Sequence, residues 1–383
     1  MYCARIHKFI AQMISLFRRM GLWHGEDRPT VRQLVLKSFY CIYYLSFMIS
    51  LSMGSYKAES VDETIFLAET ALICAVLNIK NWMFLWKQTE IVEFLDRICV
   101  FTIRDEEGLA FFNDKVERFI NFLKMCVYGT MCATLGCVVV PFLGSKKSLL
   151  VNIAFPLDWK NSEIGFWMAY IFIVTEYVIE ILAITFSVII WYLLLHCSIR
   201  YRILGMEMKN MGRTAGKVKM SVNEQQAIFY QDLQASIEGH LHLKGIIDEV
   251  ESFLSKLFLL QFATSSLCIC GSIYCLAFDI SANIVERLVH VYLFLFNTAE
   301  LFMITYFGNE IMLSSSTLSY SLFESEWIGQ PHSTQKCIII FGEYLKRSYS
   351  MLKDKLYPLT LVTFTKILNS SYRLFNILKN TKQ

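Results

Sequence analysis

Seven stretches of this chain are long and apolar enough to cross a membrane as helices. A helix needs about 20 mainly apolar residues to cross the roughly 30 Å of hydrocarbon in a bilayer. The fifth stretch carries no formal charge from 257 to 278. The approximate bounds are 34–54, 62–86, 119–143, 165–196, 257–278, 287–312 and 356–379. We therefore expect an all-α membrane protein with seven transmembrane helices.

The composition excludes the pair of soluble domains that 383 residues could otherwise form. Hydrophobic residues make up 55% of the chain and charged residues 18%, and the mean hydropathy is +0.43. These values are typical of integral membrane proteins. The sequence contains no nucleotide-binding loop, metalloprotease motif or nucleophile elbow. We expect no enzymatic activity, no cofactor or metal ion and no nucleic acid partner.

Lys and Arg are distributed unevenly between the two sides of the expected spans. Seven precede or begin the first span, five lie in the connection 81–118 and seven in 197–252. The opposite connections carry one, three and none. Because positive residues concentrate in cytosolic loops, the N-terminus is expected in the cytosol. After seven crossings, the C-terminus is expected outside the cell.

The chain is expected to divide into three parts. Residues 1–33 form a cytosolic amphipathic segment, in which Ile6, Phe9, Ile10 and Phe17 recur at helical spacing among basic residues. Two interpretations stay open for it: a helix lying on the membrane surface or an ordinary packed helix of a cytosolic layer. Residues 34–312 hold the first six spans, their cytosolic extensions and a ligand pocket, and residues 313–383 hold a cytosolic helix and the last span.

The two long cytosolic connections predict helices that continue the spans below the membrane. In 87–118, apolar residues at spacings of three and four alternate with charges. In 197–252, a breaker region at 212–218 precedes an amphipathic run. The segment 337–352 is too short and charged to span and predicts a cytosolic helix. Together these helices would form an anchor domain for an oligomer.

The last span has two contrasting faces. Its apolar side is formed by Leu361, Phe364, Leu368, Phe375 and Leu378. The other side carries Lys366, Ser370, Arg373, Ile377 and Asn380. A charge inside a membrane-length segment is costly unless it meets water or a partner, so it marks a candidate functional site. One face is expected to meet lipid or protein, and the other water.

Several other spans carry titratable side chains. Lys124 and Glu310 lie near the inner interface, where they can reach water, and His290 is expected at the outer mouth of the sixth span. Glu176 and Glu180 are one turn apart and are expected to face a hydrated cavity or be partly neutral. Cysteines 268, 270 and 275 share the fifth span, where packing at helix contacts explains them better than metal binding does.

Aromatic residues concentrate in the outer halves of the spans and predict an apolar pocket for small volatile molecules. By depth and face alone, eight residues on four spans are candidates for the ligand contacts. They are Phe66, Thr70, Thr134, Val138, Phe172, Glu176, Tyr292 and Phe296.

Two segments resemble the insect odorant receptors. The segment 306–327 (YFGNEIMLSSSTLSYSLFESEW) holds a Gly-Asn-Glu, a serine-rich stretch and a terminal tryptophan. The segment 357–378 holds Pro-Leu-Thr-Leu and Ser-Tyr. The stretch 242–262 and the Pro-Leu-Asp at 156–158 are also similar to that family.

This resemblance implies a ligand-gated, nonselective cation channel in the plasma membrane of olfactory sensory neurons. Odorant-binding subunits would assemble with a shared co-receptor into a heterotetramer surrounded by membrane lipid. Each subunit would contribute its last helix to the pore, with Ile377 at a hydrophobic constriction and Arg373 and Asn380 one turn to either side. Small hydrophobic odorants would bind among the second, third, fourth and sixth spans.

Three other classes remain open from sequence. A gustatory receptor of the same superfamily typically shows Thr-Tyr and Gln-Phe where this chain has Thr363-Phe364 and Ser371-Tyr372. A G-protein-coupled receptor would need the opposite orientation and usually a disulfide to the outer loop 144–165, which has no cysteine. A transporter is disfavoured because no internal repeat is visible.

Overall fold

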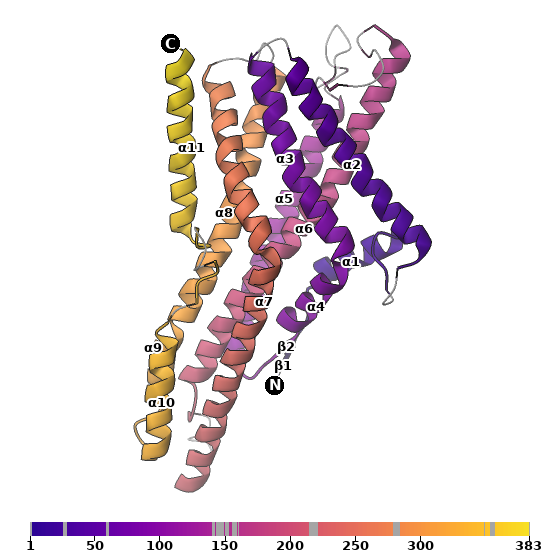
Figure 1. Cartoon of the computed structure of the whole chain (residues 1–383). Coiled ribbons are helices and arrows are strands. Elements are labelled where there is room, and N and C mark those ends of the chain that lie inside the picture. Colours follow the sequence, from indigo (N-terminus) through magenta and orange to yellow (C-terminus); the bar gives the residue numbers. More distant parts are fainter. Residues whose placement is uncertain are drawn as a thin grey trace.

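The chain folds almost entirely into helices, which run side by side in an elongated bundle (Figure 1). The computed structural model describes residues 2–25, 29–58, 61–139, 161–213, 221–278, 284–347, 349–352 and 357–382, with single positions at 142, 149, 153, 154 and 159. In chain order the elements are β1 (Tyr2–Ala4), α1 (Lys8–Arg19), α2 (Val31–Lys57), α3 (Val61–Trp86), α4 (Gln88–Cys99), β2 (Phe101–Ile103), α5 (Glu106–Val139), α6 (Glu163–Lys209), α7 (Val222–Ala277), α8 (Ile284–Ser316), α9 (Leu318–Phe323), α10 (His332–Leu345) and α11 (Leu361–Lys382).

Five helices of the described part of the chain are long and apolar enough to cross a membrane. They lie in α2, α5, α6, α7 and α8. The expected second and seventh spans, α3 and α11, are not among these five. Both carry charges within their length, including Glu69 and Lys80 in α3 and Lys366 and Arg373 in α11. An all-α membrane fold is thus confirmed, while the number of crossings and the orientation stay predictions.

The longest helices continue well below the level at which α11 begins (Figure 1). Helix α6 has 47 residues and α7 has 56, more than twice what a bilayer requires. Helix α7 begins at a capping box, in which the Ser221 hydroxyl accepts from the Glu224 N–H and the Glu224 carboxylate accepts from the Ser221 N–H. The amphipathic run that the sequence places in this connection is therefore part of a continuous helix.

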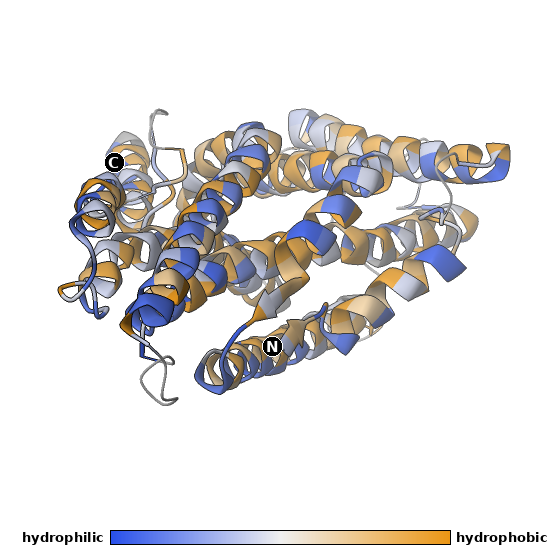
Figure 2. Ribbon diagram, turned by 90° about the horizontal axis from the view of Figure 1, so that it is seen from below, coloured by the Kyte–Doolittle hydropathy of each residue, from blue (hydrophilic) through white to orange (hydrophobic). Residues whose placement is uncertain are grey.

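The lower ends of these helices pack with the short helices into a layer that we call the anchor layer. It comprises α4, α9, α10 and the lower parts of α5, α6 and α7. Seen from below in Figure 2, its helices mix hydrophilic residues with hydrophobic ones, as amphipathic helices do. Arg97 of α4 forms a two-pronged ion pair with Glu249 of α7, at 2.5 and 3.0 Å. The helix expected in 337–352 overlaps α10, which begins five residues earlier, at His332, and ends at Leu345.

The N-terminal segment packs against the end of α3, and its strand β1 joins β2 next to the anchor layer. Ile10, Ile14 and Phe17 of α1 are buried, and the indole N–H of Trp23 donates to the Phe84 carbonyl at 3.0 Å. Strand β1 pairs antiparallel with β2, with Cys3 opposite Thr102. Of the two interpretations left open by the sequence, the structure supports the packed helix. The two strands, three residues each, carry no sequence pattern that would have predicted them.

Candidate functional site

Helix α11 packs against α7 and α8 through one face only. Thr363, Ile367 and Ser371 are buried there, and Ser371 donates to the Ser266 hydroxyl of α7 at 3.4 Å. The Phe364 ring lies 5.5 Å from that of Phe302 in α8. The opposite face carries residues that are exposed in the single chain, namely Lys366, Ser370, Arg373, Ile377 and Asn380. Helix α11 has two contrasting faces, as expected, but its buried face is centred on Thr363, Ile367 and Ser371. The expected apolar residues lie beside this face: Leu361, Phe364, Leu368 and Phe375 are half-buried and Leu378 is 39% exposed.

The segment that leads into α11 is tied to the anchor layer. The Tyr349 hydroxyl lies 2.7 Å from an Asp248 carboxylate oxygen and 2.8 Å from one of Glu251, both in α7. Burial is the main cause that raises the pKa of Tyr349, and both carboxylates add to it. The Leu352 N–H donates to Glu251 at 2.9 Å. A movement of α7 would therefore reach the base of α11 through these bonds.

A glycine sets how closely this segment approaches α8. A Cβ on Gly308 would lie 2.5 Å from the Leu359 carbonyl oxygen and would also overlap the Leu359 side chain. Gly308 is the glycine of the Gly-Asn-Glu sequence in the C-terminal part of α8. The close approach of Leu359 explains why the first residue of this Gly-Asn-Glu motif is a glycine.

The eight candidate ligand residues fall into separate contacts. Phe66 of α3 meets His290 of α8, with ring centroids 4.9 Å apart, and Tyr292 stacks on Phe296 at 6.2 Å. Phe172 of α6 lies against α2, with its ring centroid 5.2 Å from that of Tyr43 and 5.8 Å from that of Phe47.

The remaining four candidates are polar or lie on α5. The Thr70 hydroxyl donates to its own helix, to the Phe66 carbonyl at 2.8 Å. Thr134 and Val138 are half-buried, and the Val138 carbonyl accepts from the Tyr170 hydroxyl of α6 at 3.0 Å. Glu176 is 1% exposed, and neither of its carboxylate oxygens has a hydrogen-bond partner. Instead of facing a hydrated cavity in this structure, it is enclosed, so it is a polar group able to accept a bond from a ligand.

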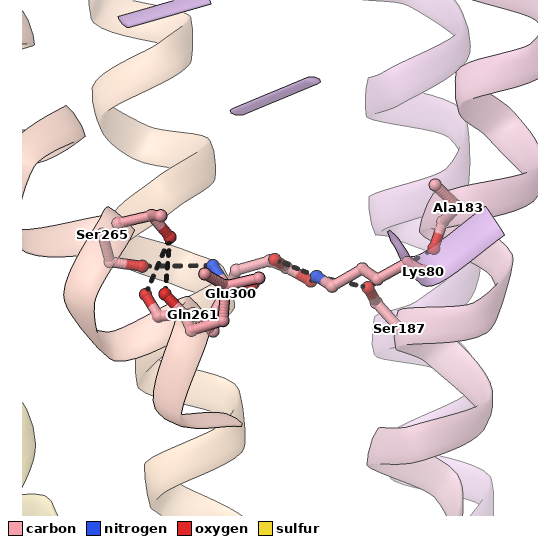
Figure 3. A network of polar contacts seen from close by, with 8 residues as sticks. Lys80, Ala183, Ser187, Gln261, Ser265 and Glu300 are labelled. Carbon is pink, nitrogen blue, oxygen red and sulfur yellow. Dashed lines mark hydrogen bonds and ion pairs between the residues drawn. The ribbon is translucent and has the colours of Figure 1, made fainter. Parts of the chain in front are cut away.

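A buried ion pair crosses the middle of the bundle (Figure 3). The Lys80 ammonium of α3 lies 2.5 Å from a Glu300 carboxylate oxygen of α8 and 3.1 Å from the Ser187 hydroxyl of α6. On the other side of Glu300, Gln261 donates to Ser265 within α7 at 3.1 Å. The sequence analysis did not single out Lys80, although a lysine six residues before the end of a membrane-length helix is a signal that could have identified it.

One groove lies between α5, α6 and α8. It has a volume of about 600 Å³, with an aromatic wall that includes Phe119, Phe302 and Phe307 and a basic rim at Arg118 and Arg202. None of the eight candidate ligand residues lines it. It is therefore distinct from the outer pocket that the sequence predicts.

Comparison with known proteins places the chain in a family. The family model described as "7tm Odorant receptor" matches residues 60–372. Odorant receptor 94a of Drosophila melanogaster is 22% identical over 97% of this chain and 96% of its own length. Odorant receptor 23a of the same fly is 26% identical over 62% of this chain and 61% of its own length.

Solved structures show the same fold. The olfactory receptor OR5 from Machilis hrabei superimposes with a TM-score of 0.77 at 12% identity, over 96% of this chain and 98% of that one. Its complex with eugenol gives a TM-score of 0.79 at 13% identity, over 98% of both chains. With a family model matching most of its length, this chain belongs to the insect odorant receptor family and is a multi-pass membrane protein.

Proposed function

We propose that this odorant receptor is the ligand-binding subunit of an odorant-gated, nonselective cation channel. It would sit in the plasma membrane of olfactory sensory neurons, with its N-terminus in the cytosol and its C-terminus outside after seven crossings. Co-receptor subunits would complete a heterotetramer around a pore to which α11 contributes. The proposal includes no reaction and no cofactor.

The observation that carries the proposal is the exposed polar face of α11. Lys366 and Arg373 project from a membrane-length helix on the side that no other helix of the described chain covers. A basic residue at the centre of a bilayer costs about 3 kcal/mol or more when it faces lipid. Water in a pore or a neighbouring subunit removes this cost. The opposite face already has its partners in α7 and α8, which supports an assembly in which the polar face looks inward.

Ile377 supports a gate at the outer end of this face. Its side chain is 60% exposed in the single chain, although it is apolar and stands one turn from Arg373 and near Asn380. A ring of such side chains can close a pore by excluding water, and opening would widen and hydrate it. Arg373 next to a cation gate is best accommodated in a mixed assembly, where other subunits supply a surface without this charge and Arg373 pairs across the interface.

The ligands proposed are small hydrophobic odorants, bound in the outer half of the bundle. The structure of OR5 with eugenol supports a small organic ligand for this fold. Phe66, Tyr292 and Phe296 offer aromatic surfaces on α3 and α8, and Glu176 offers a buried acceptor on α6. This mixture suits molecules that are mainly apolar with one polar group.

Recording odorant-evoked currents with and without the co-receptor tests the proposal. Cells that express this chain together with a co-receptor should conduct cations when an active odorant is found in a screening panel. Cells that express either subunit alone provide the controls. Robust current from this chain alone would contradict the role of the co-receptor. Absence of current from every odorant, with both subunits shown at the cell surface, would contradict the channel itself.

A further inference from the structure

Three side chains that can ligate a metal meet near one end of the bundle. Glu69 lies in α3, Cys275 in α7 and His290 in α8, and one ligand atom from each lies within 4.8 Å of the others. Each side chain is nearly fully buried, at 3%, 1% and 4% exposure. Because the three residues lie on three different helices, no single-helix pattern brings them together. The sequence alone favoured packing as the role of Cys275 and predicted no metal site.

The cluster contains polar atoms that lack partners within the protein. The Glu69 Oε1 atom accepts from the Ser272 hydroxyl, while Oε2 has no hydrogen-bond partner. The Nδ1 atom of His290 also has none. Buried polar atoms are almost always paired, so two orphaned ones in the same cluster point to a missing ligand.

The surroundings hold the side chains in place. The His290 ring lies edge-on to Phe66, with centroids 4.9 Å apart. A Cβ at Gly271 would lie 3.1 Å from Glu69 Oε2, so the glycine gives the carboxylate the space that it needs beside α7. The hydroxyl of Ser272 orients the other oxygen. Such supporting contacts are what metal ligands usually receive from their neighbours.

The donor set fits a zinc ion in geometry and in charge. Carboxylate, thiolate and imidazole are the three ligand types that Zn²⁺ takes in proteins. Around a tetrahedral Zn²⁺ such atoms stand about 3.5 Å apart. Because the three ligand atoms already lie within 4.8 Å of one another, they need to move by about 1 Å at most to reach this arrangement. One carboxylate and one thiolate balance the two positive charges, which makes the occupied site neutral and suited to a buried position.

We propose that Glu69, Cys275 and His290 form a three-ligand Zn²⁺ site that joins α3, α7 and α8. A fourth position stays open to water or another small ligand, as in zinc sites that are not purely structural. The residues lie eight residues after the start of α3, two before the end of α7 and six after the start of α8. The ion would thus bind at the ends of the three helices that lie together, away from the anchor layer, and would hold them against one another.

Spectroscopy of the purified full-length receptor tests this site without any channel assay. Co²⁺ replaces Zn²⁺ in such sites, and a thiolate ligand gives it a charge-transfer band that oxygen ligands do not. The wild-type protein should show this band with one equivalent of Co²⁺ and lose it when Zn²⁺ is added. The Cys275→Ser variant should lack the band, and His290→Gln should bind Zn²⁺ at least about tenfold more weakly.

Cys270→Ser is the matched control, because Cys270 is buried on the same helix but is not part of the cluster. It should keep both the band and the affinity. Thermal unfolding of each variant without metal shows whether it is folded, and Zn²⁺ should raise the midpoint of the wild type and the control only. A wild-type protein without the thiolate band, or a Zn²⁺ affinity unchanged in both Cys275→Ser and His290→Gln, would overturn the proposal.

Discussion

The Lys80 ammonium lies 2.5 Å from the Glu300 carboxylate, and both side chains are buried, with 1% and 4% of their surface exposed. The two residues are 220 positions apart and join α3 to α8. These are two of the helices on which the proposed odorant contacts lie. The pair therefore connects the region below the pocket to a helix that contacts α11.

Removing one partner of this pair should destabilise the receptor strongly. Lys80→Met leaves an uncompensated buried carboxylate, which typically costs about 3–5 kcal/mol. Adding Glu300→Gln should recover part of the loss. Thermal unfolding of the purified protein and the amount at the cell surface would measure both effects.

The control is an ion pair with the same N–O distance that is exposed to solvent. Lys87 and Glu90 also lie 2.5 Å apart, but each is 43% exposed. Lys87→Met should change the free energy of unfolding by no more than about 1 kcal/mol. Equal effects of Lys80→Met and Lys87→Met would show that the buried pair has no special role.

Substituting Gly308 tests the contact between α8 and the segment before α11. In Gly308→Ala the new methyl group would overlap Leu359, and overpacking of this kind typically costs about 1–3 kcal/mol. Gly129→Ala in α5 is the control, because a Cβ there has open space and should stabilise the helix by about 0.5–1 kcal/mol. Chemical or thermal unfolding compares the two. If Gly308→Ala stabilised the receptor as Gly129→Ala does, α8 and Leu359 would not approach closely.

Acid should weaken the anchor layer through His240. This side chain packs between Tyr201, Phe341 and Tyr344, and burial lowers its pKa to about 4. The positive charge of Lys244 makes a smaller contribution to this lowering of the pKa. The unfolded chain, with an ordinary histidine pKa of about 6.5, binds the proton more readily. Stability is therefore intact above pH 6.5 and falls as the pH drops towards 4, by at most about 3 kcal/mol.

The His240→Phe variant should lose less stability than the wild type between pH 6.5 and 4. His332→Phe is the control, because His332 is exposed at the start of α10. Unfolding of the purified receptor at several pH values measures the difference. An unchanged pH profile in His240→Phe would show that His240 is not protonated on unfolding in this range.

Ile377 should control leak through the channel. Ile377→Ser, expressed with the co-receptor, is expected to raise the basal current or alter permeation because a polar ring no longer excludes water. Val362 is also 60% exposed but lies at the other end of α11. Val362→Ser should leave the basal current near the wild-type level. Unchanged conductance and selectivity in Ile377→Ser would place this residue outside the pore.

The sequence predicts single helices well and their partners poorly. Periodicity within one segment accounts for the exposed polar face of α11, the continuation of α6 and α7 past their membrane-length stretches and the apolar face of α1. Lys80 with Glu300, and Glu69 with Cys275 and His290, depend on which helices become neighbours. A pattern along one helix does not contain that information. His290 was expected to be an ordinary interfacial residue, yet it is 4% exposed.

The predicted odorant pocket shows the same limit of prediction from sequence. Phe172 was chosen by depth and helix face, and the structure places its ring against Tyr43 and Phe47 of α2. Only the folded chain reveals that α2 covers this part of α6. By contrast, the exposed side of α11 can be predicted without knowing which helices pack beside it. Charged residues and small polar residues recur along this side at helical spacing.

Cysteine accessibility along α11 tests most directly whether its exposed face lines the ion pathway. Ser370 is exposed, whereas the adjacent Ser371 is fully buried against α7. Each would be changed to cysteine, as would Asn380 beyond the proposed gate, and a membrane-impermeant cationic thiol reagent would be applied from outside during recordings with the co-receptor. The wild type controls for the native cysteines.

The reagent is expected to alter the current of Asn380→Cys with or without odorant. It should alter that of Ser370→Cys only while odorant holds the gate at Ile377 open, and leave Ser371→Cys unchanged. Two results would contradict a pore lined by this face of α11. In the first, the reagent modifies Ser371→Cys but has no effect on Ser370→Cys. In the second, it affects neither Ser370→Cys nor Asn380→Cys in an open channel.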